Sequence, residues 1–426
     1  MKLFFAAACA AIMLMIPLTS FASPDVSAEA ALLIDAETGL TLFEKNADDT
    51  RFPASTTKIM TAILAAELGE MDDILTASFE AVNTIAPDSS KIFLWEGENM
   101  SLGDLFYALI VASANDAANV IAEHIGGSTD EFVGMMNRRA AELGANSTHF
   151  VNAHGLHAEN HYTTAKDLAI IARHAMSIPA FAEAVQVNTY RIAPTNKFTE
   201  ERVLYSTNLM INPVSSYYYK NATGIKTGYT SNAGGCLVAS AQNGTSSLIS
   251  VVLCAGNNGG KTMSFVDSAN LFEYGFKTLK PHTLVASGDV ISQLPVKNAR
   301  GSKEIVLEAA QTKSIVLPEN TDVSDIKKVE YVRNTVKAPI KKGEMMGRME
   351  YWLGDIKLAD VEMLSVADYE KAPFMLIINP VSAALKSVWF YVAAVILGLI
   401  YFVLKLKKRR KHRAQVMQYR KRRNGI

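Results

Sequence analysis

Two hydrophobic patterns divide the first 280 residues of the chain. Apolar and polar positions favour extended structure at 31–44, with a turn at 36–39, and again at 222–230, 234–242 and 247–255. Between and after these segments, apolar residues recur every three or four positions, which predicts helices at 56–69, 102–111, 116–125, 130–143, 164–175 and 264–275. Strands at both ends with helices between them predict an α/β (α+β) domain in which both ends complete one sheet and helices pack on it.

The pattern changes after Pro281. Short apolar runs separated by Gly, Pro, Asn and Asp predict strands around 305–307, 315–317, 329–332, 349–352 and 361–364. Strands this short and this closely spaced are typical of a small all-β domain. We therefore expect two folded domains.

The N-terminus has the pattern of a secretory signal peptide. Lys2 precedes the apolar run 3–18, and Ser20-Phe21-Ala22 resembles a cleavage site with small residues. An uncleaved N-terminal anchor is the alternative, but Pro17 interrupts the run and favours cleavage. The part of the chain between the signal and the C-terminal run is then expected outside the cytoplasm.

The C-terminus has the pattern of a membrane anchor. Eighteen residues without a charge, 387–404, match the length that a helix needs to cross a bilayer, and Trp389, Tyr391 and Tyr401 lie near its ends. Eleven Lys or Arg residues and no acidic residue follow, which predicts a cytoplasmic tail at 405–426. A basic tail also occurs in nucleic-acid-binding proteins, but its position directly after an apolar run favours a role in membrane orientation, so no nucleic-acid partner is predicted.

The formal net charge of zero conceals an uneven distribution. Outside the tail and Lys2, the chain contains all 42 acidic residues but only 30 basic ones, so the exported part is acidic.

Two cysteines remain after the signal, Cys236 and Cys254, in apolar runs joined by Asn243-Gly244, a dipeptide typical of a hairpin turn. A disulfide and two free thiols are both compatible with this placement, and we favour free thiols. The spacing matches no metal site.

The first motif with chemical content is Ser55-Thr56-Thr57-Lys58, at the start of a predicted helix. Side chains three residues apart lie on one helix face, so Lys58 can reach the Ser55 hydroxyl. A neutral lysine can remove the serine proton, but bringing its pKa close to 7 costs roughly 4–5 kcal/mol and requires burial and a second nearby cation. Ser-x-x-Lys alone also fits an ordinary helix cap.

Two further motifs follow in the chain. Ser113-Ala114-Asn115 lies between two predicted helices, where Ser113 or Asn115 could equally cap a helix. Lys226-Thr227-Gly228 lies on a predicted strand, where the glycine permits close approach of another backbone and Lys226 would supply the second cation. Each motif alone is weak. The order and spacing of all three match the active-site serine set of penicillin-binding proteins and β-lactamases.

The chain resembles the low-molecular-mass penicillin-binding proteins that act as D-alanyl-D-alanine carboxypeptidases, peptidase family S11. The resemblance extends over about residues 25–372 and is carried by the segments 53–62, 113–118, 148–156, 161–168, 224–241 and 337–364. It implies the β-lactamase-like transpeptidase fold, an antiparallel sheet flanked by helices, and no cofactor or metal. The resulting domain boundaries are 1–22 (signal peptide), 23–280 (catalytic), 281–372 (β-rich), 373–386 (linker), 387–404 (transmembrane) and 405–426 (tail).

The resemblance also implies roles for individual residues. Ser55 would attack the carbonyl between the last two D-alanines of a peptidoglycan stem peptide, with Lys58 as the base. Ser113 and Lys226 would pass a proton to the departing D-alanine. Asn115 would bind the peptide amide, and Thr227 would bind the terminal carboxylate. Gly228 and Tyr229 complete the implied substrate-binding residues, and the backbone N–H of Tyr229 would form the oxyanion hole together with that of Ser55. β-Lactam antibiotics would acylate Ser55.

Two departures and three alternatives accompany this resemblance. The arginine expected at the start of the helix near 264 is replaced by Ser264, with Lys261 as the nearest cation, and the C-terminal anchor is expected to cross the membrane rather than lie on it. A class A β-lactamase would need a glutamate that positions water, and Glu159 has no matching surroundings. An endopeptidase and a catalytically silent wall-binding protein remain open. His154, His157 and His161 are too loosely spaced for a metal site.

Overall fold

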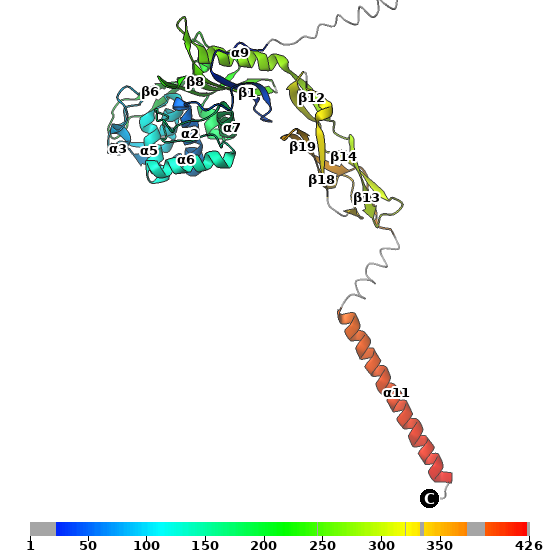
Figure 1. Cartoon of the computed structure of the whole chain (residues 1–426). Helices are drawn as coiled ribbons and strands as arrows, with labels where there is room; N and C mark the ends of the chain where they lie inside the picture. Colours follow the sequence, from blue (N-terminus) through cyan, green and yellow to red (C-terminus); the bar gives the residue numbers. More distant parts are fainter. Residues whose placement is uncertain (1–22, 245, 320, 333–335, 373–387, 424–426) are drawn as a thin grey trace, which may run out of the picture. The chain divides into compact units, whose positions relative to one another are not determined.

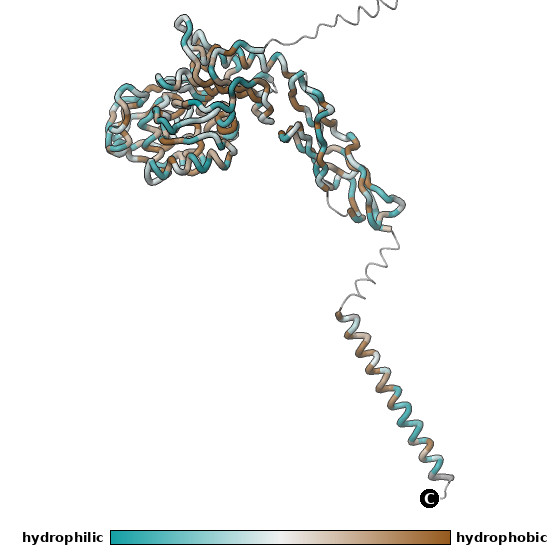
Figure 2. Tube along the Cα trace, in the orientation of Figure 1, coloured by the Kyte–Doolittle hydropathy of each residue, from teal (hydrophilic) through white to brown (hydrophobic). Residues whose placement is uncertain are grey.

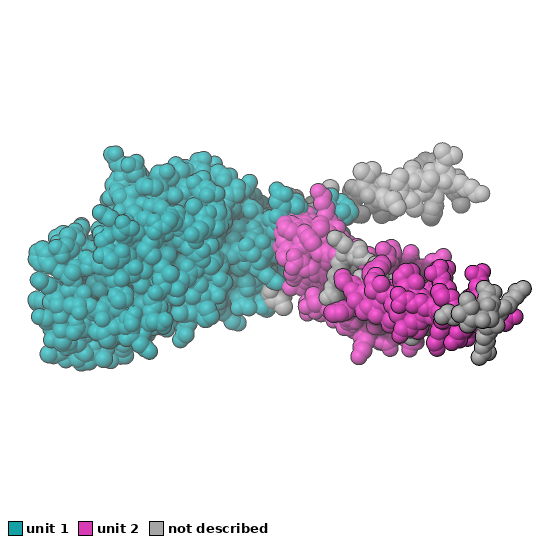
Figure 3. Space-filling view, turned by 90° about the horizontal axis from the view of Figure 1, so that it is seen from below, with its two compact units in different colours: residues 1–282, 316–325, 354–356 teal, residues 283–315, 326–353, 357–426 magenta. Residues whose placement is uncertain are grey.

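The computed structural model describes residues 23–244, 246–319, 321–332, 336–372 and 388–423 (Figure 1). The predicted signal peptide and the predicted linker 373–386 lie outside these residues. The chain divides into two compact units, which are coloured separately in Figure 3. The first contains residues 1–282 with two short later segments, and the second contains most of the remainder.

A five-stranded antiparallel sheet forms the centre of the first unit, in the order β2-β1-β9-β8-β7. Its strands are β1 (Ala30–Asp35), β2 (Thr41–Lys45), β7 (Ala222–Thr230), β8 (Gly234–Asn243) and β9 (Ser246–Ala255). The predicted Asn-Gly hairpin connects β8 to β9, with Gly244 at φ 61°. The prediction that the two ends of the domain complete one sheet is confirmed.

Alternation along the strands separates two hydrophobic cores. In β1, Leu32 and Ile34 belong to the core beneath the helical region, whereas Ala31 and Leu33 belong to the core beneath α9 (Met263–Thr278). Figure 1 shows α9 on one face of the sheet and, on the other face, α2 (Lys58–Leu68), α5 (Asn115–Gly126), α6 (Thr129–Leu143) and α7 (Ala165–Met176). A strand buried on both faces must be apolar at every position, and all six residues of β1 are buried.

The predicted helices are present within a few residues of their expected ends. They are α2 (Lys58–Leu68), α4 (Leu102–Val111), α5 (Asn115–Gly126), α6 (Thr129–Leu143), α7 (Ala165–Met176) and α9 (Met263–Thr278). Ser101, Ser128 and Thr164 cap α4, α6 and α7 by accepting a backbone N–H. A 3-10 turn, η1 (Ala54–Thr57), precedes α2 and carries Ser55.

Several short elements in the first unit had no clear sequence pattern. They are α3 (Phe79–Asn83), α8 (Pro179–Ala184), β3 (Ile74–Thr76), β4 (Asn99–Ser101), β5 (Thr189–Ile192), β6 (Arg202–Tyr205), η2 (Leu209–Ile211), β10 (Asn257–Asn258) and β11 (Lys261–Thr262). The strands pair as β3 with β4, β5 with β6 and β10 with β11. Elements of two to six residues are too short for a hydrophobic period to be read reliably.

The β-rich part of the second unit, up to residue 372, has its own core, as the sequence predicts. Its six-stranded sheet has the order β16-β18-β19-β14-β13-β17. The elements of the C-terminal β region are β12 (Leu279–Val285), β13 (Val290–Lys297), β14 (Glu304–Ala309), β15 (Lys313–Pro318), η3 (Val323–Asp325), β16 (Lys327–Val332), β17 (Val336–Lys337), β18 (Met345–Leu353) and β19 (Ile356–Ser365). Ile305, Leu307, Tyr351 and Met363 are almost completely buried in this core.

A long helix, α11 (Val388–Arg423), forms the C-terminal part of the described chain. Figure 2 shows that its apolar residues come first and its polar residues follow. Among the described residues, no helix meets the length and apolarity that a membrane crossing requires.

Candidate active site

The first motif residues lie in contact at the start of α2. Lys58 Nζ is 3.0 Å from Ser55 Oγ, 2.6 Å from Asn115 Oδ1 and 2.6 Å from the carbonyl oxygen of His154. Ser55 is in the turn η1 and Lys58 is the first residue of the helix, so both side chains project to the same side, as expected from their spacing. A lysine in this position can exchange a proton directly with the serine hydroxyl.

The surroundings of Lys58 favour its neutral form. Its side chain is fully buried, and burial lowers its pKa well below the ordinary value. The positive charge of Lys226 lowers this pKa further, and the carboxylate of Asp116 opposes both effects. The structure thus provides both conditions that a lysine needs in order to act as a base near neutral pH, which are burial and a second nearby cation.

Lys226 is buried on β7, the edge strand of the sheet, and only 1% of it is exposed. Burial lowers its pKa to about 7. Its Nζ donates to the carbonyl oxygen of Thr227 at 3.2 Å. Lys226 therefore differs from an ordinary strand lysine, whose side chain would be exposed to solvent.

The residue after Thr227 determines how closely the strand approaches the serine. A Cβ atom on Gly228 would lie 2.9 Å from the backbone nitrogen of Ser55 and 3.0 Å from the carbonyl oxygen of Pro53. Only glycine permits this approach of β7 to η1. The close contact places the backbone N–H of Ser55 beside the strand that carries Tyr229.

The second motif lies in the connection between α4 and α5. Ser113 has φ 58°, a left-handed conformation uncommon for serine, and it is buried. The N-cap position of α5 is Ala114, which makes no side-chain cap, and Asn115 accepts from Lys58. The helix-cap alternative for Ser113 and Asn115 is thus wrong, and both residues face the candidate site.

A cleft of about 730 Å³ gathers six of the eight predicted site residues on its walls. These are Ser55, Ser113, Asn115, Thr227, Gly228 and Tyr229. Lys58 and Lys226 are buried beside it rather than on its surface. All eight residues, from three separate parts of the chain, therefore belong to one site.

The departures from the family pattern can also be placed. Ser264, at the position of the expected arginine, lines the cleft at the start of α9. The side chain of Lys261 lies outside what the structure describes, so its role as a substitute cation remains a prediction. Glu159 lines a different hollow from the Ser55 cleft. Cys236 and Cys254 are free thiols, as favoured from the sequence.

Three residues of the site were not identified from the sequence. Thr207 Oγ1 is 2.6 Å from Thr227 Oγ1 and thereby orients the hydroxyl expected to meet a carboxylate. Gly155 packs so closely against Ala54 that a Cβ atom at position 155 would lie 1.9 Å from the carbonyl oxygen of Ala54. Each of these contacts joins distant parts of the chain, and a single sequence carries no signal for them.

The third of these residues is His161, which supports the turn that carries Ser55. The backbone N–H of Val151 donates to His161 Nδ1, so Nε2 carries the hydrogen and donates to Thr57 Oγ1 at 2.8 Å. Burial lowers the pKa of His161 to about 4 and the pKa of His154 to about 3. Both rings are thus neutral near pH 7 and hold the loop in place by hydrogen bonds.

Comparison with known proteins decides the family. Residues 18–257 match the family model described as D-alanyl-D-alanine carboxypeptidase, and residues 279–371 match the C-terminal domain of penicillin-binding protein 5. The chain belongs to the D-alanyl-D-alanine carboxypeptidase family. The carboxypeptidase DacF of Bacillus subtilis is 32% identical over 353 residues, covering 82% of this chain and 87% of DacF.

Solved structures agree with this assignment. Penicillin-binding protein 5 from Haemophilus influenzae is 29% identical with a TM-score of 0.63, covering 83% of this chain and all of that one. Penicillin-binding protein 6B from Escherichia coli is 27% identical with a TM-score of 0.59, covering 81% and 97%. The fold of this D-alanyl-D-alanine carboxypeptidase family member is therefore that of the penicillin-binding proteins, with sheets, helices and a C-terminal all-β domain.

Buried carboxylates hold the segment 92–98, which follows the cleft-lining residues 86 and 88–90 in the chain. Glu98 accepts two hydrogen bonds from Arg202, at 2.7 and 3.0 Å, and one from the backbone N–H of Trp95. Asp116 in turn accepts from the backbone N–H groups of Ile92 and Leu94. The two carboxylates thus fix the segment that leads from the cleft wall to β4.

Replacing Arg202 with methionine should destabilise this unit by about 3–5 kcal/mol, because Glu98 is completely buried and would lose its counter-charge. The measurement is chemical unfolding followed by circular dichroism. Arg191→Met is the matched control, since Arg191 pairs with Glu201 on the surface and should change stability by less than about 1 kcal/mol. Equal effects of the two substitutions would contradict the structural role of the Glu98–Arg202 pair.

Proposed function

We propose that this protein removes the C-terminal D-alanine from peptidoglycan stem peptides through an acyl-enzyme on Ser55. The observation that carries the proposal is the 3.0 Å contact between Lys58 Nζ and Ser55 Oγ beside a second buried lysine. Neutral Lys58 removes the hydroxyl proton while Ser55 Oγ attacks the carbonyl carbon. The backbone N–H groups of Ser55 and Tyr229 receive the negative charge that develops on the carbonyl oxygen.

The second half of the first step expels D-alanine. Ser113 and Lys226 carry a proton to the departing amine, and the bond between the carbonyl carbon and that nitrogen breaks. Asn115 binds the peptide amide, and Thr227, oriented by Thr207, binds the terminal carboxylate. Water then attacks the ester on Ser55 and restores the free serine. A β-lactam forms the same ester but retains its leaving group, so its release is slow.

The decisive experiment combines intact-mass spectrometry with an assay of D-alanine release. The purified protein should gain one equivalent of benzylpenicillin and should release D-alanine from a stem pentapeptide. Rapid destruction of the drug without a lasting adduct would indicate a β-lactamase instead, and intact drug with unmodified protein would indicate a silent wall-binding protein. A cross-linked peptide dimer assayed in parallel measures endopeptidase activity.

The position of Glu159 argues against the β-lactamase alternative. Fast deacylation in a class A β-lactamase depends on a glutamate that positions water at the acyl-enzyme. Glu159 lines another hollow, and among the described residues that line the Ser55 cleft Asp88 is the only acidic one. Asp88 is exposed at its edge. Slow deacylation is therefore the expected behaviour.

We further propose that the protein is exported and held at the membrane as a single-pass protein, with its catalytic unit outside the cytoplasm. The support is the signal-like N-terminus, the uncharged run 387–404 and the basic tail after it. In this arrangement the β-rich domain spaces the catalytic unit from the bilayer or contacts partners.

Truncation after residue 372 tests the anchor. The full-length protein should sediment with membranes and require detergent for release, whereas the truncated protein should appear in the soluble extracytoplasmic fraction. Treatment of the full-length protein in membranes with alkaline carbonate is the control, because it removes peripheral but not spanning proteins. Sedimentation of the truncated protein with membranes would contradict the proposed anchor.

A further inference from the structure

The two cysteines of the first unit lie opposite each other at a bulge between β8 and β9. The register of these strands shifts between Gly235 and Leu237. Cys236 therefore faces two residues of β9, Leu253 and Cys254. Opposed residues of antiparallel strands have Cα atoms about 4.5–5.5 Å apart, within the range of about 4.4–6.8 Å that a disulfide spans. These are the only cysteines of the chain after the predicted signal peptide.

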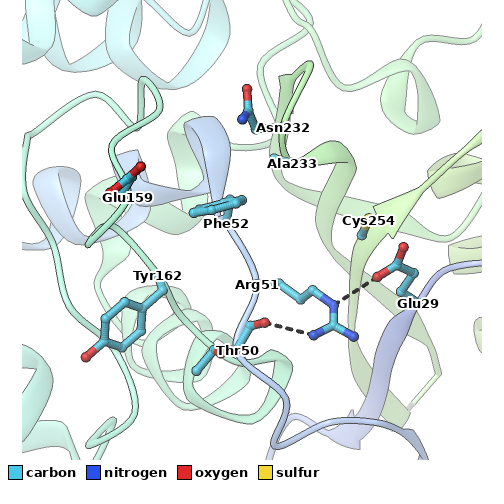
Figure 4. A pocket seen from close by; sticks show the side chains of 9 residues that line it. All are labelled: Glu29, Thr50, Arg51, Phe52, Glu159, Tyr162, Asn232, Ala233 and Cys254. Carbon is cyan, nitrogen blue, oxygen red and sulfur yellow. Dashed lines mark hydrogen bonds and ion pairs between the residues drawn. The ribbon is translucent and has the colours of Figure 1, made fainter.

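Cys254 is the extra residue of the bulge, and its thiol is accessible. It has φ 58°, a left-handed conformation that favours glycine. Its neighbours Leu253 and Ala255 are buried in the cores on opposite faces of the sheet. Cys254 instead is half-buried and lines a hollow of about 660 Å³, where Figure 4 shows it beside Glu29. A small molecule that enters this hollow can therefore reach the Cys254 sulfur.

Cys236 lies toward the Ser55 cleft. It lines the cleft wall, although only 1% of the residue is exposed. Its Sγ donates a weak hydrogen bond to the carbonyl oxygen of Phe52 at 3.6 Å. Phe52 also lines the hollow that contains Cys254. Phe52 is thus a neighbour that both cysteines share, and it lies between the hollow and the turn that carries Ser55.

The surroundings of the two thiols keep both of them protonated. Burial raises the pKa of Cys236 to about 12, a hydrogen bond from the Cys254 backbone opposes this shift, and the Cys254 thiol adds to it. Burial and Glu29 raise the pKa of Cys254. One thiol is therefore close enough to affect the ionisation of the other. Because the thiolate is the reactive form, both cysteines stay reduced until a reactive disulfide reaches Cys254.

We propose that Cys236 and Cys254 are a redox modification site, which a disulfide compound converts into an intramolecular disulfide. The Cys254 thiolate attacks one sulfur of the compound, forms a mixed disulfide and releases a first thiolate. The Cys236 thiolate then attacks the Cys254 sulfur and releases a second thiolate. The two cysteine protons leave with these thiolates, so the pair is oxidised by two electrons and the compound is reduced to two thiols. The proposed export places the pair where such exchange occurs.

The disulfide affects Ser55 through the carbonyl group of Phe52. Oxidised Cys236 has no S–H group, so the hydrogen bond to this carbonyl, three residues before Ser55, is lost. Loss of one weak hydrogen bond corresponds to about a two- to fivefold change in a rate. Acylation of Ser55 by benzylpenicillin should therefore be slower by this factor in the oxidised protein. This consequence rests on the proposed function, whereas the disulfide itself does not.

The test uses the full-length protein in detergent with the substitution Cys9→Ala, so that only the two cysteines remain. Cystamine is the disulfide compound, because the exposed Glu159 carboxylate in the hollow attracts its ammonium groups. Treatment should lower the intact mass by two hydrogen atoms, and neither cysteine should react with iodoacetamide after unfolding in urea. Dithiothreitol should restore both thiols. Cys236→Ala should instead retain one cysteamine group on Cys254, and Cys254→Ser should remain unmodified.

The outcomes separate the disulfide from its effect on the cleft. A lasting cysteamine adduct on the two-cysteine protein, two thiols that stay reduced, or a disulfide between two molecules would each overturn the proposed site. Equal acylation rates of the reduced and oxidised forms would overturn the effect on Ser55. Failure of the reduced protein to be acylated would count against the proposed function and leave the mass measurement valid. Thermal unfolding of each variant verifies that it is folded.

Discussion

Replacing Ser55 with alanine should abolish both the benzylpenicillin adduct and the release of D-alanine. The substitution removes only the Oγ atom that Lys58 contacts at 3.0 Å, so the bond-forming atom disappears while the cleft remains. Removing a catalytic serine typically lowers kcat by about 10⁴-fold or more. Intact-mass spectrometry after brief exposure to the drug should show an added mass on the wild type and none on the variant.

The control must separate lost chemistry from lost folding. Ser177→Ala replaces an exposed serine of the same unit, at the end of α7, and should retain the full adduct. The Ser55→Ala protein should also unfold at nearly the wild-type temperature, since Ser55 lies at the cleft and its neighbours Thr56 and Thr57 provide the buried contacts of the turn. A lasting adduct on Ser55→Ala would identify another nucleophile and contradict the mechanism.

The fold could be predicted where elements are long and their hydrophobic period is regular. The helices predicted at 102–111 and 130–143 agree with the structure almost to the residue, because apolar positions recur there at helical spacing. The β8–β9 hairpin was found because Asn243-Gly244 interrupts two apolar runs. The three-residue strands β3 and β4 were missed, because three residues cannot display a period.

The site could be predicted as a set of motifs but not as a set of contacts. Ser55 and Lys58 are three residues apart, so helix geometry alone brings them together. The contact of Lys58 with Asn115 depends on how α2 packs on α5, and the bond between Thr207 and Thr227 depends on the path of the chain between β6 and β7. Local spacing carries no information about such packing.

Replacing Lys58 with methionine should lower the rate constant of Ser55 acylation by about 10²- to 10⁴-fold, the range of a general base. Methionine fits the buried site without a charge, so the serine keeps its position but loses the group that accepts its proton. The measurement is stopped-flow acylation with a chromogenic β-lactam. Lys58→Arg keeps the charge but cannot release a proton near neutral pH, so an equally slow arginine variant identifies Lys58 as a base, whereas an active one would contradict that role.

The pH dependence provides an independent test of the same role. A base acts in its neutral form, so the wild-type acylation rate should rise as pH increases through the pKa of Lys58, which burial and Lys226 hold well below its ordinary value. Lys226→Met removes that second cause, so the pKa of Lys58 should increase and the rising part of the profile should move to higher pH. A profile that stays in place would show that Lys226 does not tune Lys58, and a shift to lower pH would contradict the electrostatic argument. Since burial lowers the pKa of Lys226 itself to about 7, the wild-type rate should also decline at higher pH, because the proposed mechanism takes from it a proton for the nitrogen that leaves the carbonyl carbon. That decline should vanish in Lys226→Met, which makes the two lysines separable in one set of profiles.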